Sequence, residues 1–252
     1  MGKSIIELSG VHKRFGDQEV LRGLDLAIES GAVSVIIGRS GGGKSVLLKH
    51  VIGLLRPDKG AVTVDGEDIQ DMGPRQLGAV RRKFGLLFQE AALFDSMTVF
   101  ENVAFPLNEH TRLSRAEIRD RVESKLASVG LSGMGYKMPA ELSGGMRKRV
   151  GLARAIALDP KIVLFDEPTS GLDPVVGAAI NELIIQTRDE FGATCLVISH
   201  DIQATMSIAD TVHMLYEGTI IASGTPGEIQ ALDDPVVQQF IQGRAEGPIK
   251  IA

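Results

Sequence analysis

The first third of the chain carries short segments rich in apolar residues that favour β-strands. This pattern predicts strands at 5–8, 21–28 and 62–64, and Asp65-Gly66 is a turn signal after the last of them. The run at 33–37 is apolar apart from Ser34 and shows no alternation, which is typical of a strand covered on both faces. We expect a helix over 46–55, soon after this run.

Between about residues 89 and 159 the apolar positions change to helical spacing. Ser114 and Glu117 form a capping-box pattern, and Gly130 follows the apolar series as a suitable stop. A second helix is expected to begin near Gly144 and to run to Leu158. This part of the chain is therefore predicted to be mainly helical.

Two more continuous apolar runs follow, at 162–165 and 195–199, with a predicted helix over 176–188 between them. A strand, a helix and another strand in this order indicate a parallel sheet. The sequence thus predicts an α/β fold. After Asp234 the sequence contains few clear signals of secondary structure.

Composition limits the possible functions. A chain of 252 residues fits one large domain or two closely associated lobes. The formal net charge of −5, the absence of Trp and the presence of only two Tyr argue against a nucleic-acid-binding surface. Cys195 has no second cysteine to pair with, which fits a reducing cytoplasm.

The sequence also bears on membranes. Glu7 interrupts the N-terminal stretch where a signal peptide would continue its apolar segment. No apolar run approaches the roughly 20 residues that span a bilayer. If the protein acts at a membrane, we expect it to act through a partner.

The stretch from Gly38 to Ser45 fits the phosphate-binding pattern G-x-x-x-x-G-K-S. Its glycines let the backbone aim N–H groups at an anion, and the following helix directs its positive end there. Lys44 would neutralise phosphate charge, and the Ser45 hydroxyl would bind Mg²⁺. The alternative is a flexible glycine loop that binds nothing, but the position between a strand and a helix favours the phosphate site.

A second motif places two carboxylates, Asp166 and Glu167, at the end of the strand predicted at 162–165. Adjacent acids are common in loops, so the pair is weak evidence alone. With a phosphate-binding loop upstream, Asp166 would hold the Mg²⁺ water shell, and Glu167 would polarise an attacking water.

Leu142-Ser143-Gly144-Gly145-Met146 ends 20 residues before Asp166 and opens a predicted helix. Alone it could be a glycine linker. In this context it resembles the signature of the ABC-transporter ATPases, and four further elements resemble motifs of that family in the right order. They are Phe15, Gln89, the segment Ser170-Gly171-Leu172-Asp173, and His200 after the run at 195–199.

This resemblance implies the P-loop ABC ATPase fold, with a RecA-like mixed sheet, an antiparallel β subdomain and an inserted helical subdomain. The expected domains are a nucleotide-binding core at 1–88 and 160–236, a helical signature subdomain at 89–159 and a C-terminal tail at 237–252. The tail is either frayed or a docking strap for a neighbouring subunit.

The resemblance also implies a head-to-tail homodimer in which each ATP lies between the P-loop of one copy and the signature of the other. The expected catalytic residues are Glu167, His200 and Gln89. The expected metal site holds Mg²⁺ with Ser45, Gln89 and Asp166. The residues expected to bind ATP are Phe15, Gly38, Arg39, Ser40, Gly41, Gly42, Gly43, Lys44, Ser45, Val46, Ser143, Gly144, Gly145 and Asp173.

The signature departs from the family pattern at Met146, where Gln is usual. We expect Ser143 and the glycine backbone to make the phosphate contacts. The basic residues Arg147, Lys148 and Arg149 are interpreted as the solvated face of the signature helix. Cys195 is interpreted as core, and the histidines outside the motifs show no metal-binding spacing.

The segment 89–107 contains more apolar residues than a connector needs, among them Leu93, Phe94 and Phe100. They form either the core of the helical lobe or a groove that receives a short permease helix. The stretch "ALFDSMTVFENVAFPL" resembles the ATPases of Mla and Mce lipid transporters, and "HTRLSRAEI", "KMPAELSGGMRKRVGLARAIAL" and "FIQGRAEGPI" are similar to the Mla branch.

That branch implies phospholipid transport between the inner and outer membranes, with the ATPase peripheral on the cytoplasmic face of the inner membrane. Its implied partners are an MlaE-like permease, a small MlaB-like STAS-domain subunit and a periplasmic MlaD-like lipid-binding subunit. Two alternatives stay open: the ATPase of a small-solute importer, and a soluble ABC ATPase of repair or translation. The single cassette and compact helical lobe argue against the last.

Overall fold

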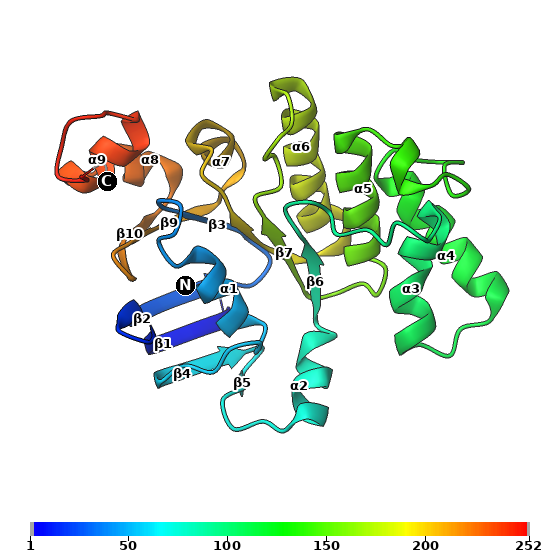
Figure 1. Ribbon diagram of the computed structural model, residues 1–252, viewed down its shortest axis with the longest axis horizontal. Coiled ribbons are helices and arrows are strands. Elements are labelled where there is room, and N and C mark those ends of the chain that lie inside the picture. Colours follow the sequence, from blue (N-terminus) through cyan, green and yellow to red (C-terminus); the bar gives the residue numbers. More distant parts are fainter. Residues whose placement is uncertain (1–2, 251–252) are drawn as a thin grey trace. The chain divides into compact units, whose positions relative to one another are not determined.

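The structure is a computed structural model that describes residues 3–250, and the chain forms two compact units (Figure 1). Unit 1 comprises the chain up to Arg81 and from Leu196 onward, and unit 2 comprises Arg82–Cys195. The predicted division at 88, 159 and 236 stays a prediction, since these units are cut at other residues.

Unit 1 contains an antiparallel sheet with the strand order β2-β1-β4-β5. Ile6 is paired with Ile28 on one side and with Val64 on the other, and these side chains are buried. The strands predicted at 5–8, 21–28 and 62–64 are confirmed, and each extends further than the apolar pattern indicated. The strands are β1 (Ser4–Phe15), β2 (Gln18–Glu29), β4 (Lys59–Val64) and β5 (Glu67–Asp68).

A second sheet contains β3 (Val33–Ile37), whose five residues are all buried, as the apolar run without alternation predicts. β3 is parallel to β9 (Thr211–Tyr216), and β9 forms an antiparallel hairpin with β10 (Thr219–Gly224). On its other side β3 is followed by β8 (Thr194–Ile198), the strand along which the chain passes from unit 2 into unit 1.

The helices of unit 1 are short and mostly capped by side chains. Asp201 accepts a hydrogen bond at the start of α7, and Thr225 and Glu228 form a capping box at α8. The predicted helix at 46–55 is shorter than expected at its end, because Gly53, which follows the capping residue Ile52, adopts φ +67°. The helices are α1 (Lys44–Val51), α2 (Pro74–Arg81), α7 (Ile202–Ile208), α8 (Pro226–Ala231) and α9 (Pro235–Gln242).

Unit 2 combines parallel strands with helices. β6 (Phe84–Leu87) runs parallel to β7 (Ile162–Asp166), with Leu86 opposite Leu164. In Figure 1 the helix α5 (Gly144–Ala155) lies beside α6 (Pro174–Phe191), and α3 (Val99–His110) and α4 (Arg115–Ser128) lie beyond α5. A short 3-10 helix, Pro139–Glu141, precedes α5. The expected helical character of 89–159 is confirmed.

The capping-box prediction is also confirmed. Ser114 accepts a hydrogen bond from the backbone of Glu117, and the Glu117 side chain accepts one from the backbone of Ser114. Gly130 lies just beyond the end of α4 with φ +72°, a left-handed conformation that favours glycine. These local interactions explain why both ends of α4 could be located from sequence.

Candidate functional site

The glycine-rich loop of unit 1 joins the end of β3 to the start of α1. Gly38 has φ +154°, and a Cβ there would lie 2.4 Å from the Leu215 carbonyl oxygen. Gly43 has φ +100°, a backbone angle that residues other than glycine rarely adopt. The loop backbone therefore follows a path that requires glycine at both of these positions.

The first turn of α1 provides a site suited to an anion. Gly43 caps the helix without a side chain, so no side-chain oxygen covers the positive end of α1. The Lys44 side chain is buried, and its Nζ donates to the carbonyl oxygens of Gly38 at 2.6 Å and Arg39 at 3.0 Å. An ammonium group and an uncovered helix N-terminus in one loop fit the phosphates of a nucleotide. On this loop Arg39, Ser40 and Gly41 are exposed and Gly42 is half-buried; in the first turn of α1, Ser45 is exposed and Val46 is half-buried.

Unit 1 holds two further predicted site residues. His200 is exposed and directly follows the buried Ser199, whose N–H donates to the Ile36 carbonyl oxygen at 3.2 Å. Phe15 ends β1 with 45% of its surface exposed, and Lys13 Nζ lies 5.6 Å from its ring centroid. An exposed aromatic face of this kind is available to stack on a flat ligand.

Unit 2 holds the predicted acids at the end of β7. Asp166 is the last residue of the strand, and Glu167 follows with φ +49°, an uncommon backbone conformation for a residue with a side chain. The N–H of Ser170 donates to the Glu167 carbonyl oxygen at 3.1 Å and closes the turn. The exposed Gln89 donates from Nε2 to Ser170 Oγ at 3.3 Å. The structure therefore brings Gln89 to the segment that follows Glu167.

The predicted signature opens α5. Ser143 is exposed, and its Oγ accepts a hydrogen bond from the Met146 N–H at 3.2 Å. This cap uses the backbone of Met146, so the change from Gln to Met does not remove it. A Cβ on Gly145 would lie 2.5 Å from Val176 Cγ1, while one on Gly144 would lie 3.4 Å from Leu172 Cδ2. Gly145 is thus required for close packing of α5 against α6.

Asp173, also predicted to bind nucleotide, has a clear local role. Its Oδ1 accepts hydrogen bonds from the N–H groups of Val175 and Val176, both at 3.1 Å, and Pro174 occupies the first helical position of α6. A contact between Asp173 and nucleotide stays a prediction.

The interpretation of the basic tract as a solvated face is confirmed for Arg147, which is exposed, and is wrong for Lys148. Lys148 is only 5% exposed, and its Nζ donates to backbone carbonyl oxygens after β7; Arg149 is half-buried and donates to the Val129 carbonyl oxygen at 3.1 Å. Lys148 lies three residues after Gly145 and four before Leu152, so all three share the buried face of α5. That spacing is the signal that sequence analysis missed.

The apolar segment 89–107 is divided between core and surface, and a permease helix bound to its exposed part stays a prediction. Val99, Val103 and Leu107 are buried in the core, whereas Phe94 and Phe105 are 42% and 37% exposed, with their ring centroids 4.9 Å apart. Arg154 of α5 donates to the carbonyl oxygens of Ala91 at 2.6 Å and Ala92 at 2.8 Å, two alanines with positive φ. The segment after Gln89 is thus fixed to α5 and presents aromatic rings to solvent.

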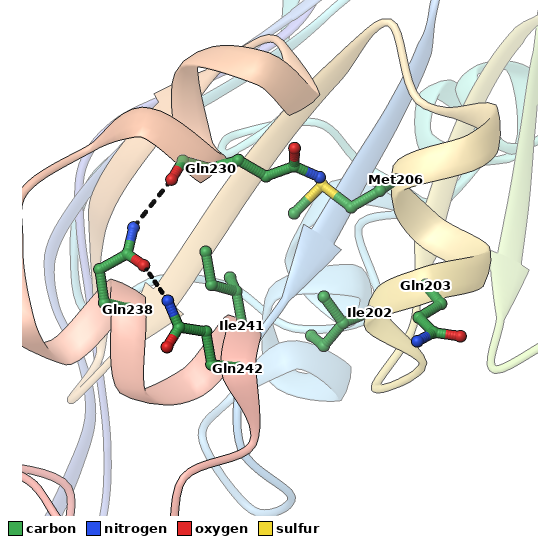
Figure 2. A pocket seen from close by; sticks show the side chains of 7 residues that line it. All are labelled: Ile202, Gln203, Met206, Gln230, Gln238, Ile241 and Gln242. Atoms are coloured by element: carbon green, nitrogen blue, oxygen red, sulfur yellow. Dashed lines mark hydrogen bonds between the residues drawn. The ribbon is translucent and has the colours of Figure 1, made fainter.

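The described part of the C-terminal tail is not frayed. The buried Gln239 of α9 donates to the Ile249 carbonyl oxygen at 3.1 Å and accepts from the Ile249 N–H at 2.6 Å. Figure 2 shows a groove beside this helix, between α7, α8 and α9. The groove is lined by Ile202, Gln203, Met206, Gln230, Gln238, Ile241 and Gln242. Residues 251–252 of the predicted tail lie outside the described range.

Other predictions concern metals, cysteine and membranes. Over residues 3–250 no cluster of three or more His, Cys, Asp or Glu side chains is arranged to hold a metal ion. Cys195 is buried in β8, as expected of a core residue. In the same described range, no helix has the length and apolar character needed to cross a membrane.

A strand, a glycine loop with a buried lysine and a helix, together with an acid pair at a strand end, define a P-loop nucleotide-hydrolysing protein. A family profile described as "ABC transporter" matches residues 21–170. The chain belongs to the ABC transporter family. It is therefore a transporter ATPase that binds and hydrolyses ATP, which confirms the predicted fold class and enzyme class.

Two relatives match nearly the whole chain. The chain is 48% identical to the "probable ribonucleotide transport ATP-binding protein mkl" of Mycobacterium tuberculosis, over 99% of this chain and 69% of that protein. It is 41% identical to the "intermembrane phospholipid transport system ATP-binding protein MlaF" of Haemophilus influenzae, over 99% of this chain and 95% of that protein.

Two solved structures share the fold. The cbiO1 protein of Clostridium perfringens, part of the ABC transporter complex cbiONQ, has a TM-score of 0.85 at 32% identity, over 90% of this chain and 91% of that one. The ATP-binding cassette MJ0796, in a dimeric post-hydrolysis state bound to ADP and Pi, has a TM-score of 0.80 at 32% identity, over 88% of this chain and 98% of that one.

Proposed function

We propose that this chain is the ATP-hydrolysing subunit of a transporter that moves phospholipid between the inner and outer membranes. The observation that carries the proposal is its similarity to MlaF, which extends over nearly the full length of both proteins. The ATPase would be peripheral, on the cytoplasmic face of the inner membrane.

In unit 1 the proposed role of the glycine loop is to bind the phosphates of ATP. The backbone of Gly38–Ser45 and the start of α1 would donate hydrogen bonds to phosphate oxygens. Lys44 would leave its carbonyl partners and neutralise phosphate charge, and Phe15 would stack on the adenine. His200 would contact the terminal phosphate. The buried position of Lys44 and the uncapped helix start support this assignment.

In unit 2 the proposed base is Glu167, which would orient and deprotonate a water molecule for attack on the terminal phosphate. In unit 2 the proposed Mg²⁺ ligands are Asp166 and Gln89, and in unit 1 the proposed Mg²⁺ ligand is Ser45. The ion would supply charge neutralisation for the phosphoryl group. Carboxylate, amide and hydroxyl oxygens are suitable ligands for this ion.

We further propose that two copies assemble head to tail and that Ser143, Gly144 and Gly145 of one copy contact the ATP bound to the other. The exposed Ser143 and the N-terminus of α5 suit a phosphate approaching from outside the molecule. The dimeric state of the similar cassette supports this assembly. Asp173, which is exposed at the start of α6, would lie at the same interface.

The proposed membrane partner is an MlaE-like permease whose short cytoplasmic helix contacts the exposed Phe88, Phe94 and Phe105. Aromatic side chains left in solvent are suitable anchors for an amphipathic helix. An MlaB-like STAS-domain subunit and an MlaD-like periplasmic lipid-binding subunit complete the proposed complex.

One observation favours a second candidate. The similar mycobacterial protein carries the name of a ribonucleotide transporter, so the cargo of this chain would be a small polar solute. The ATPase chemistry would be the same in both cases, because the motifs that carry it do not contact cargo.

The deciding experiment is purification of the protein with its partners from native membranes, followed by mass spectrometry of the subunits and of extracted small molecules. A permease, a lipid-binding subunit and enriched phospholipid are the expected result. A permease with a soluble solute-binding protein and no lipid enrichment would favour the second candidate. The absence of any membrane partner would contradict both.

A further inference from the structure

Lys148 is a buried cation in unit 2 that the proposed ATPase chemistry does not use. It lies on α5, one turn after the signature glycines, and is 5% exposed. Its Nζ donates to the carbonyl oxygens of Ser170 at 2.6 Å, Pro168 at 2.7 Å and Glu167 at 3.4 Å. One ammonium group therefore binds three carbonyl groups of a single turn.

The chemistry of this contact is well matched. An ammonium group has three N–H donors, and the turn supplies three acceptors. Burial lowers the pKa of Lys148, whereas the Glu90 and Glu167 carboxylates act in the opposite direction. Burial of an ammonium group without these partners would cost free energy, because the charge would lose its hydration without compensation. The contact therefore ties the turn to α5.

The turn that Lys148 holds is an unusual one. Glu167 adopts φ +49°, a conformation that costs on the order of 1 kcal/mol or more for a residue with a side chain. The Ser170 N–H closes the turn on the Glu167 carbonyl oxygen, and Ser170 Oγ accepts the hydrogen bond from Gln89. The backbone angles at Glu167 set the direction of its side chain. The contacts of Lys148 that hold the turn therefore also orient the Glu167 carboxylate.

We propose that Lys148 is a positioning residue for ATP hydrolysis: it fixes the turn 167–170 to the signature helix and so aims the Glu167 carboxylate. The inference rests on the proposed role of Glu167 as the base. It adds a link between the signature and the base, because a movement of α5 would be transmitted to the turn through Lys148. The position of a base matters strongly, since a misplacement of about 1 Å can lower a rate by about 100-fold.

The test uses Lys148→Met, which keeps an unbranched apolar side chain and removes all three N–H donors. We expect kcat for ATP to fall by about 10-fold or more while KM changes by less than about 3-fold, because the loop that binds phosphate is in unit 1. Lys148→Gln keeps two N–H donors on a side chain shorter than that of lysine. Its kcat is expected to lie between the kcat of Lys148→Met and that of the wild type. The control is Arg115→Met, a change at an exposed basic residue of α4, with unchanged kcat.

A double-mutant cycle separates positioning from general stability. When Glu167→Gln has already removed the base, adding Lys148→Met is expected to lower kcat no further, whereas a merely structural role would add a second loss. If Lys148→Met does not fold, as judged by thermal unfolding, Lys148→Gln decides: a reduced kcat at unchanged KM supports the inference. A wild-type kcat in the folded variant would overturn it. Normal hydrolysis by Glu167→Gln alone would instead overturn the proposed role of the base.

Discussion

The ammonium nitrogen of Lys44 lies 2.6 Å from the carbonyl oxygen of Gly38, so this side chain is folded back onto the loop that precedes α1. If the loop binds phosphate, the charge of Lys44 is needed there. We expect Lys44→Ala to weaken ATP binding by about 10- to 100-fold, the usual effect of losing a hydrogen bond to a charged group. Isothermal titration calorimetry measures this change.

Lys49 provides the matched control, because it lies on the same helix and is exposed. Lys49→Ala is expected to bind ATP as the wild type does. Equal affinities for both variants would contradict the assignment of the loop.

Replacement of Glu167 by Gln keeps the shape of the side chain and removes its ability to accept a proton. We expect kcat to fall by about 100- to 10,000-fold, with ATP binding retained. A phosphate-release assay measures turnover. Glu182→Gln, an exposed change on α6, is the control and should leave the rate unchanged. Near-normal hydrolysis by Glu167→Gln would remove the base from the proposed mechanism.

Ser143→Arg tests the head-to-tail dimer. The substitution places a bulky cation at the exposed start of α5 but leaves unit 1 unchanged. We expect ATP to bind to the monomer with wild-type affinity and hydrolysis to be lost. Mixing with Lys44→Ala protein should restore at most one competent site per dimer. If Ser143→Arg alone hydrolyses ATP normally, the proposed assembly is wrong.

Gly145→Ala tests the packing of the signature helix. The added Cβ would lie 2.5 Å from Val176 Cγ1, and the branched Val176 side chain has few ways to move aside. We expect a loss of about 1–3 kcal/mol in the free energy of unfolding. Gly144→Ala is the control for stability, since its Cβ would make an ordinary contact at 3.4 Å. Equal unfolding midpoints in urea for the two variants would contradict the close packing of α5.

The buried His213 gives a prediction for pH. Burial lowers its pKa from 6.5 to about 4, so the folded state keeps it neutral where the unfolded chain takes up a proton. Its contribution to stability is therefore complete above pH 6.5 and is lost as the pH falls towards 4. The loss approaches about 3 kcal/mol.

We expect His213→Asn to reduce this pH dependence, because the amide does not titrate and can still bond to Ser223, the partner of His213 Nδ1. Urea unfolding at pH 7.5 and pH 5 measures the difference. His110→Asn, at an exposed position, should preserve the wild-type slope. The free energy of unfolding of His213→Asn should still depend on pH to some extent, since burial also lowers the pKa of His50. An unchanged slope in His213→Asn would show that His213 is not responsible.

The features that sequence analysis predicted correctly depend on neighbours along the chain. The buried run of β3, the capping box of Ser114 and Glu117, and the stop at Gly130 each follow from residues a few positions apart. The family could be identified for the same reason, since each motif is a short segment with its own spacing.

Tertiary structure alone decided what those segments contact. The basic tract of α5 has the composition of a solvated face, yet Lys148 is buried because three carbonyl groups after β7 replace its water. The requirement for Gly145 comes from Val176, which is remote in sequence. Such contacts depend on how separate elements pack, and neither the periodicity nor the charge of one helix contains that information.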